Sequence, residues 1–260
     1  MLTQRPVRAK AIIGSLAVAA GITYGFDGGG PQVQAARQVI SAVLQLLAPL
    51  VAGLGCVAAA RAYARGDRER AVWMTGAWAT LAWAAGRAVF TGHQWIGGTA
   101  LPFPSLADGF FVAFYVLLGA ALCMEVRLVW RVVELPVRRN LAVCGALVWA
   151  LALAVVLVTV ARSQATVLEK ALAAFYPAAA VLLVPAGLLP AAGFRGGTSA
   201  YPWLAVAMAA VCLAAASFGF ISLIQHGLYP VVHRADALWV AGFVFLAVGG
   251  FWQRATLEEA

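Results

Sequence analysis

Two aspartates in this sequence have a spacing and a position that suggest chemistry. Asp108 and Asp236 lie 128 residues apart, and each opens an apolar stretch. A carboxylate in the first turn of a helix accepts bonds from free backbone N–H groups and faces the positive end of the helix dipole. Ser105 precedes Asp108 in the Ser-x-x-Asp capping pattern. Two interpretations are therefore open: helix capping, or a symmetric pair of acids lining an outward cavity.

Arg87 stands inside an apolar run that begins near residue 71. A guanidinium in the hydrocarbon core costs about 2.5–3.5 kcal/mol on insertion scales. Three arrangements would lower that cost: snorkelling to the interface, pairing with Asp108, or binding an anion such as a lipid phosphate. The predicted ligand-binding residues are Arg87, Asp108, Tyr176, His226 and Asp236.

The three histidines, His93, His226 and His233, fall on the predicted outer side. Two related imidazoles can ligate haem or a metal, and together with Asp236 they can bind zinc. No regular ligand spacing supports such a site, so we expect solvated or pH-sensitive histidines. We predict no cofactor and no metal, and we leave a bound lipid open.

Several enzyme classes lack their motifs. The sequence has no HExxH, GxSxG or Walker pattern, and no large polar loop on which a site could be built. Its lysines, Lys10 and Lys170, both stand at helix ends, which excludes a retinal Schiff base in the last helix. The four cysteines form no CxxC motif and are expected to be buried apolar residues. We therefore predict that the protein is not an enzyme and has no catalytic residues.

The composition predicts which kind of secondary structure positions these residues. The 260-residue chain is 63% hydrophobic and 11% charged, with mean hydropathy +0.89, whereas soluble domains carry about 25% charged residues. Its net charge of +8 comes from basic residues between apolar runs, which is typical of cytoplasmic loops and not of nucleic-acid binding. Runs of about 17–25 apolar residues predict membrane-spanning helices. The sequence predicts an all-α protein with eight such helices, at 11–26, 39–62, 71–95, 106–129, 141–161, 168–189, 201–225 and 235–252.

The basic residues also predict an orientation. Of the 18 Lys and Arg, 13 fall on one side of the predicted membrane and 5 on the other. The positive-inside rule places the richer side, with both termini, in the cytoplasm. Arg5, Arg8 and Lys10 before an apolar run resemble a secretory signal, but residues 20–23 form a poor cleavage site. We expect the first helix to be retained.

The sequence predicts a four-helix unit that occurs twice within a single membrane domain, 1–260. The first repeat covers about 11–130 and the second about 138–253. Residues 83–87 (Trp-Ala-Ala-Gly-Arg) match residues 214–217 (Ala-Ala-Ala-Ser), as Asp108 matches Asp236. An even number of helices gives both copies the same topology, which predicts a pseudo-two-fold axis along the membrane normal.

These motifs resemble a known family. The pattern is carried by residues 101–108 (Leu-Pro-Phe-Pro-Ser-Leu-Ala-Asp) with Phe114 and Tyr115, by 236–239 (Asp-Ala-Leu-Trp) with Gly242 and Phe243, and by 175–177 (Phe-Tyr-Pro). It resembles the multi-helix membrane sensor region that precedes diguanylate cyclase (GGDEF) and phosphodiesterase (EAL) domains in bacterial signalling proteins. The chain departs from that family at Arg87, Ala180 and Ser217, where the family often carries aspartate. The resemblance implies a module of the bacterial inner membrane that is detached from its output enzyme.

The sequence therefore favours a membrane sensor or scaffold that binds a ligand or lipid and works through a separate membrane or cytoplasmic partner or as a homo-oligomer. The alternative is a transporter or lipid-handling protein with two related halves. On that view Pro177, Pro185 and Pro190 would break a helix at the substrate site. A haem or metal redox subunit is the third interpretation.

Overall fold

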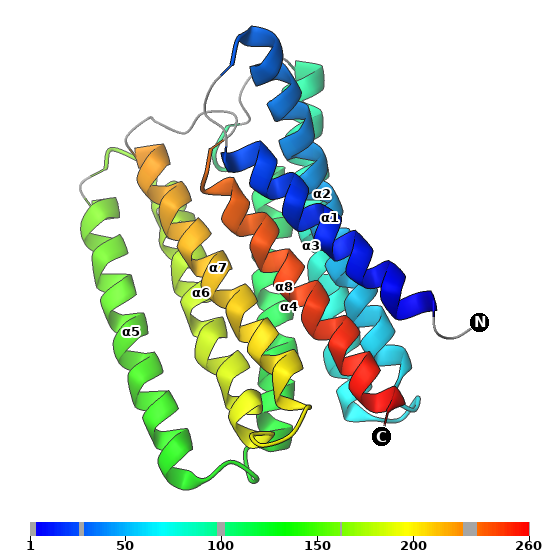
Figure 1. Cartoon of the computed structure of the whole chain (residues 1–260). Helices are drawn as coiled ribbons and strands as arrows, with labels where there is room; N and C mark the ends of the chain where they lie inside the picture. The colour runs from blue at the N-terminus through cyan, green and yellow to red at the C-terminus, as the bar shows by residue number, and fades with distance from the viewer. Residues whose placement is uncertain (1–3, 26–28, 98–101, 162, 226–232, 260) are drawn as a thin grey trace.

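The computed structural model describes residues 4–25, 29–97, 102–161, 163–225 and 233–259, and all regular secondary structure in these ranges is helical. All eight predicted segments are helices (Figure 1). The helices are α1 (Gln4–Gly25), α2 (Pro31–Arg61), α3 (Arg68–Gly97), α4 (Leu106–Val129), α5 (Leu135–Ala161), α6 (Val167–Gly193), α7 (Ala200–Gln225) and α8 (Asp236–Glu258).

Six of these helices, α2 and α4 to α8, are long and apolar enough to cross a bilayer. That finding supports a membrane protein. The apolar part of α1 is shorter and covers Lys10–Gly25. Helix α3 is not among the six, and its sequence includes the charged residues Arg68, Glu69, Arg70 and Arg87.

Several helices extend beyond their predicted bounds, and α2 and α6 differ from the sequence expectation in ways that have a clear physical reason. Helix α2 begins at Pro31, well before the predicted start at 39, because proline at the first position has its φ pre-set and its missing N–H is not needed there. Polar residues such as Gln34 then continue the helix beyond the apolar run. Helix α6 runs unbroken through Pro177, Pro185 and Pro190. A break of this helix at its prolines was therefore a wrong expectation.

Six helices form a closed ring. Helix α2 packs on α3, α3 on α4, α4 on α6, α6 on α7, α7 on α8, and α8 returns to α2. The other two helices lie outside this ring: α1 packs on α8 and α2, and α5 packs on α6 (Figure 1). Helix α1 begins and α8 ends at the same end of the bundle, which we call the inner end. The opposite end is the outer end.

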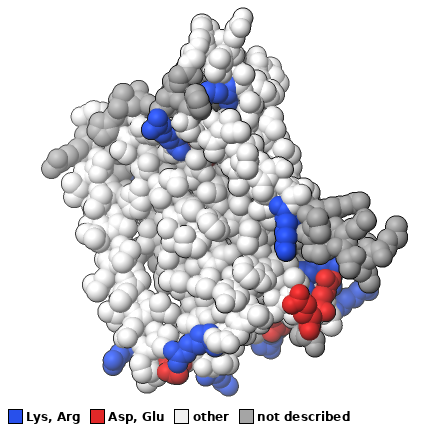
Figure 2. Space-filling view, in the orientation of Figure 1, with Lys and Arg blue, Asp and Glu red and all other residues white. Residues whose placement is uncertain are grey.

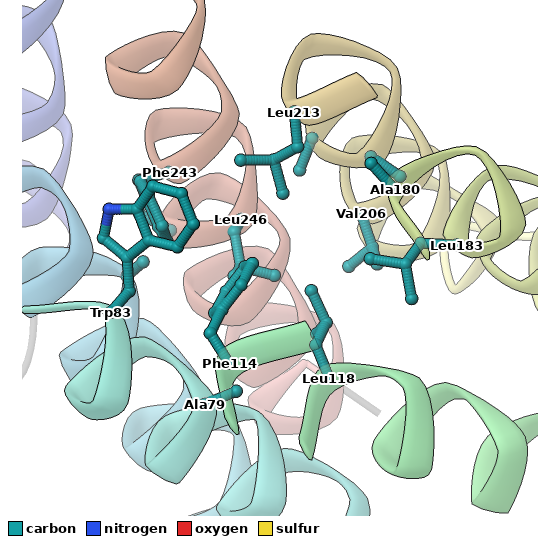
Figure 3. Close-up of a cluster of buried hydrophobic side chains, with 14 of the residues drawn as sticks. Ala79, Trp83, Phe114, Leu118, Ala180, Leu183, Val206, Leu213, Phe243 and Leu246 are labelled. Atoms are coloured by element: carbon teal, nitrogen blue, oxygen red, sulfur yellow. The ribbon is translucent and has the colours of Figure 1, made fainter. Parts of the chain in front are cut away.

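Aromatic and aliphatic side chains fill the ring to its axis. Trp83 of α3 lies with its ring centroid 4.7 Å from Trp239 and 5.3 Å from Phe243, both of α8. Phe114 of α4 meets Phe243 at 5.5 Å. Leu213 and Leu246 point into the same cluster (Figure 3). A core of this size holds the helices at fixed positions, and so it fixes the side chains at both ends of the ring.

Glycines allow the closest approach between helices α2 and α8. A Cβ atom at Gly250 would lie 2.4 Å from the carbonyl carbon of Gly55, and one at Gly55 would lie 2.9 Å from the carbonyl oxygen of Ala247. Backbone therefore meets backbone at this contact, as small residues permit between membrane helices.

The sides of the bundle expose apolar residues that suit contact with lipid. Helix α5 exposes apolar side chains along its length, with Leu147 65% and Leu151 67% exposed. Figure 2 shows charged side chains gathered near the inner end, with few at the outer end and a broad belt almost without charge between them. Such an apolar belt is stable in lipid and would be an aggregation hazard in water.

Candidate functional site

The aromatic core positions three charged residues at one level near the outer end. Arg87 follows Trp83 by one turn of α3. Asp236 precedes Trp239 by one turn of α8, and Trp239 packs on Trp83. Asp108 precedes Phe111 by one turn of α4, and the Phe111 ring lies 4.7 Å from Trp83. All three therefore lie one turn outward of the rings that meet at Trp83.

Asp108 fastens the start of α4 and joins it to α6. Its Oδ2 accepts bonds from the Ser105 backbone N–H (2.7 Å) and from Ser105 Oγ (3.0 Å). Its Oδ1 accepts the Tyr176 hydroxyl at 2.6 Å. The capping interpretation is thus confirmed for Asp108, and the carboxylate also bonds another helix. Two of the predicted ligand-binding residues, Asp108 and Tyr176, are brought together here.

Asp236 performs the same capping task at α8. Its Oδ2 accepts the backbone N–H of His233 at 2.9 Å, and it lies three residues after that donor, as Asp108 does after Ser105. The carboxylate is 1% exposed, so it is even more deeply buried than Asp108. His233 Nδ1 accepts the Ala235 N–H at 3.0 Å, which gives this imidazole a structural role.

Arg87 is half-buried and lacks the predicted partner. The partners of Asp108 are Ser105 and Tyr176, so the pairing with Arg87 is not formed. The guanidinium carbon lies 4.8 Å from the Phe90 ring centre, and Nε is buried without a hydrogen-bond partner in the described part of the chain. Tyr24 of α1 is within electrostatic range of both Arg87 and Asp236. Arg87 therefore offers a buried donor in the outer part of α3.

Two polar contacts near this level were not predicted from the sequence. The Tyr24 hydroxyl bonds Ser41 Oγ (2.8 Å), which also accepts Gln45 Nε2 (3.1 Å), and this links α1 to α2. The Tyr115 hydroxyl bonds Ser217 Oγ at 3.1 Å and links α4 to α7. A polar residue inside an apolar helix was the available signal, because such groups need a partner in the membrane. The identity of that partner depends on tertiary packing.

A groove of about 550 Å³ lies between α1 and α8. Small residues of α1 form one wall, Val240 and Phe245 of α8 form part of the other, and Tyr24 and Arg234 stand among its lining residues. The groove is mostly apolar with a polar end, which is the chemistry of a lipid.

The remaining predicted candidates are histidines. His226 lies outside the described residues, and His93 is half-buried near the end of α3. Among the residues that the structure describes, no group of three His, Cys, Asp or Glu side chains is arranged to hold a metal ion. No protein family, curated protein or solved structure matches this chain.

Proposed function

We propose that this chain is a membrane sensor or scaffold of two four-helix repeats, with all eight helices in the bilayer and both termini in the bacterial cytoplasm. It binds an anionic ligand or lipid headgroup near Arg87 and works through a separate partner protein. The observation that carries the proposal is the Arg87 guanidinium, whose buried Nε has no hydrogen-bond partner within the described residues. A buried donor on a cation is costly until an anion accepts from it.

The helix contacts support the two repeats. If α1 to α4 correspond to α5 to α8, the contact of α2 with α8 corresponds to that of α6 with α4, and both occur. The contacts within each half also correspond. Each of α1, α2 and α3 packs on the next helix, as do α5, α6 and α7. Trp73 and Trp203 occupy corresponding places in α3 and α7, and their ring centroids lie 5.2 Å apart. Corresponding residues that touch each other lie beside a two-fold axis.

The buried positions support the same correspondence. Seven of the nine buried residues of α4 have a buried counterpart 128 positions later in α8. Pro49 of α2 and Pro177 of α6 have the same separation. The counterpart of Tyr176 is Ala48, which has no hydroxyl to offer Asp236. The two proposed repeats therefore differ at the position of Tyr176, and they differ again where Arg87 corresponds to Ser217. These differences suit the binding of a single ligand at one of two related places.

Helix α3 also fits a membrane crossing despite its charges. It is 30 residues long and packs between α2 and α4 within the ring. At about 1.5 Å per residue, 30 residues exceed the 30 Å hydrocarbon core. Its outward side chains include Trp78 (60% exposed) and Ile96 (92% exposed), which suit contact with lipid.

Two hydrogen bonds give a route from the site to the rest of the protein. Tyr176–Asp108 and Tyr115–Ser217 both join α4 of the first half to helices of the second half. A ligand that pulled on Arg87 would act on α3, which packs directly on α4. The shift between the halves would be read by the partner at the inner end.

The test is binding of an anionic phospholipid to the protein in phosphatidylcholine nanodiscs. Native mass spectrometry would follow phosphatidylglycerol retained by wild type, Arg87→Gln and Lys170→Gln. We expect Arg87→Gln to weaken retention about 10-fold or more, because a charge-assisted bond is worth about 1.5–3 kcal/mol. Lys170→Gln, which removes another cation near the outer end, should retain the lipid. Equal binding by all three proteins would refute the role of Arg87.

A lipid-handling protein is the second candidate, and the α1–α8 groove favours it. A carrier should move a fluorescent lipid between the leaflets of vesicles without any other protein. A sensor or scaffold should give no flux but should retain a companion protein through gentle detergent extraction.

A further inference from the structure

A second groove lies near the inner end of the bundle, where α5, α6 and α7 meet the turn between α6 and α7 (Figure 1). Its volume is about 620 Å³, which is within the range of about 300–1,000 Å³ that small-molecule sites occupy. Helices α5 and α7 both pack on α6, and all three supply apolar lining residues, among them Leu141, Leu188 and Leu204. Leu204 is 42% exposed, so the groove opens on the apolar flank of the bundle.

The turn between α6 and α7 gives this groove a polar end. Arg195, Gly196 and Thr198 of the turn are among the lining residues. Gly196 has a φ of +86°, which favours glycine, and a Cβ atom there would meet nothing within 4 Å. The space beside the turn is therefore open to a ligand.

Several donors of this turn have no partner. The backbone N–H groups of Thr198 and Ser199 and the Thr198 hydroxyl make no hydrogen bond within the described residues. The Arg195 side chain is 61% exposed, and its Nη2 bonds Glu134 of the turn between α4 and α5. A guanidinium has five N–H donors, so this ion pair leaves most of them available to a second anion. A phosphate group, which arginine binds through two parallel bonds, suits these donors.

The two turns at this end carry an excess of positive charge. The turn between α4 and α5 and the start of α5 contain Arg131, Arg138 and Arg139, and Arg195 is in the other turn. Four arginines against the single acid Glu134 give a net charge of +3. Such a field repels the ammonium group of a zwitterionic headgroup and attracts a headgroup that is negative overall.

We propose that this groove binds one anionic phospholipid from the leaflet at the inner end of the bundle. An acyl chain lies along the apolar walls of α5, α6 and α7, and the phosphate accepts hydrogen bonds from Arg195 and Thr198. Glu134 is a positioning residue, which holds the guanidinium at the mouth of the groove. The site shares no residue with the one near Arg87, so it stands or fails independently of the outer ligand.

The measurement is photocrosslinking in phosphatidylcholine nanodiscs that contain phosphatidylglycerol with a diazirine in its acyl chain. Mass spectrometry of the peptides locates the adduct, and we expect it within residues 188–204. Unlabelled phosphatidylglycerol should suppress this adduct when it replaces part of the phosphatidylcholine, whereas inorganic phosphate should not. An adduct that unlabelled phosphatidylglycerol leaves unchanged, or that inorganic phosphate also removes, would overturn the proposal of a lipid.

Variants of the ion pair separate binding from a structural role. Arg195→Gln should raise the half-saturating fraction of labelled lipid about tenfold, as expected for loss of one charge-assisted bond. Glu134→Gln breaks the same ion pair but keeps the guanidinium, so it should bind the lipid at least as tightly as wild type. Equal losses in these two variants would show that the pair is only structural and would refute the phosphate contact.

Two further variants test the charge and the walls of the groove. Arg65→Gln is the matched control, because it removes the same charge at the inner end from the turn after α2, a helix that packs on α1, α3 and α8. It should leave the half-saturating fraction unchanged. Ala192→Phe places a ring on the α6 wall without altering the charge, and it should weaken labelling about tenfold even if Arg195→Gln does not fold. Labelling that survives Ala192→Phe at full strength would exclude the groove as the site of the acyl chain.

Discussion

Replacing Tyr176 by phenylalanine tests whether the bond to Asp108 holds α6 against α4. The change removes one hydroxyl from a side chain that is 5% exposed and leaves Asp108 Oδ1 without its 2.6 Å donor. A hydrogen bond to a charged group contributes about 1.5–3 kcal/mol, and interhelical bonds in membranes average about 0.6 kcal/mol. Because this acceptor is a buried carboxylate, we expect the higher range. That loss corresponds to about a 10- to 150-fold change in the unfolding equilibrium.

The assay is reversible unfolding in mixed detergent micelles with increasing dodecyl sulfate, followed by tryptophan fluorescence. Tyr201→Phe is the matched control, since Tyr201 is 48% exposed and stacks on Trp252. Its hydroxyl makes no hydrogen bond within the described residues. A double-mutant cycle with Asp108→Ala should give a coupling energy of about 1 kcal/mol or more. A Tyr176→Phe loss below about 0.5 kcal/mol, or one equal to the control, would refute the reasoning.

Three further predictions concern packing, titration and topology. Gly250→Ala should destabilise the protein by about 1–3 kcal/mol in a thermal melt, since its Cβ would meet Gly55 at 2.4 Å, while Gly109→Ala, with open space around it, should not. Because Tyr63 binds its proton more tightly when folded than when unfolded, its contribution to stability should be complete below pH 10 and lost as the pH rises toward 12. Tyr63→Phe should abolish that loss in alkaline melts, whereas Tyr201→Phe should keep it. In a cysteine-free background, an impermeant maleimide added to intact cells should label Ser163→Cys, in the turn between α5 and α6, but not Arg65→Cys, between α2 and α3. Labelling of both, or of Arg65→Cys alone, contradicts the predicted orientation.

Local patterns were sufficient to predict the helices. Apolar runs and their flanking residues identify all eight, and the bounds of α4 agree with the prediction at both ends. The error at the start of α2 arose because hydropathy marks where a helix enters lipid, not where its hydrogen bonding begins. A helix can extend into water at little cost when its first residue is Pro31.

The site was predicted only in part, for a different physical reason. Ser105 and Asp108 are three residues apart, so their contact follows from helix geometry alone. The Tyr176 hydroxyl reaches Asp108 across 68 residues of chain, and that contact depends on how α4 packs on α6. The same holds for Arg87, whose neighbour in the structure is Phe90 and not Asp108.

The contact between α2 and α8 is stiffer than the contact between α4 and α6. Between α2 and α8, Gly55 and Gly250 bring backbone against backbone, with no side chain between them to change its rotamer. At the corresponding place between α4 and α6, a Cβ at Gly119 would lie 3.9 Å from the flexible end of Leu183. If the two proposed repeats rock against each other, we expect the stiffer contact between α2 and α8 to be the pivot. The separation would then occur between α4 and α6, and it would have to break the Tyr176–Asp108 bond near the outer end. Because aromatic rings fill the ring to its axis, such a movement would change the shape of the bundle without opening a pore through it.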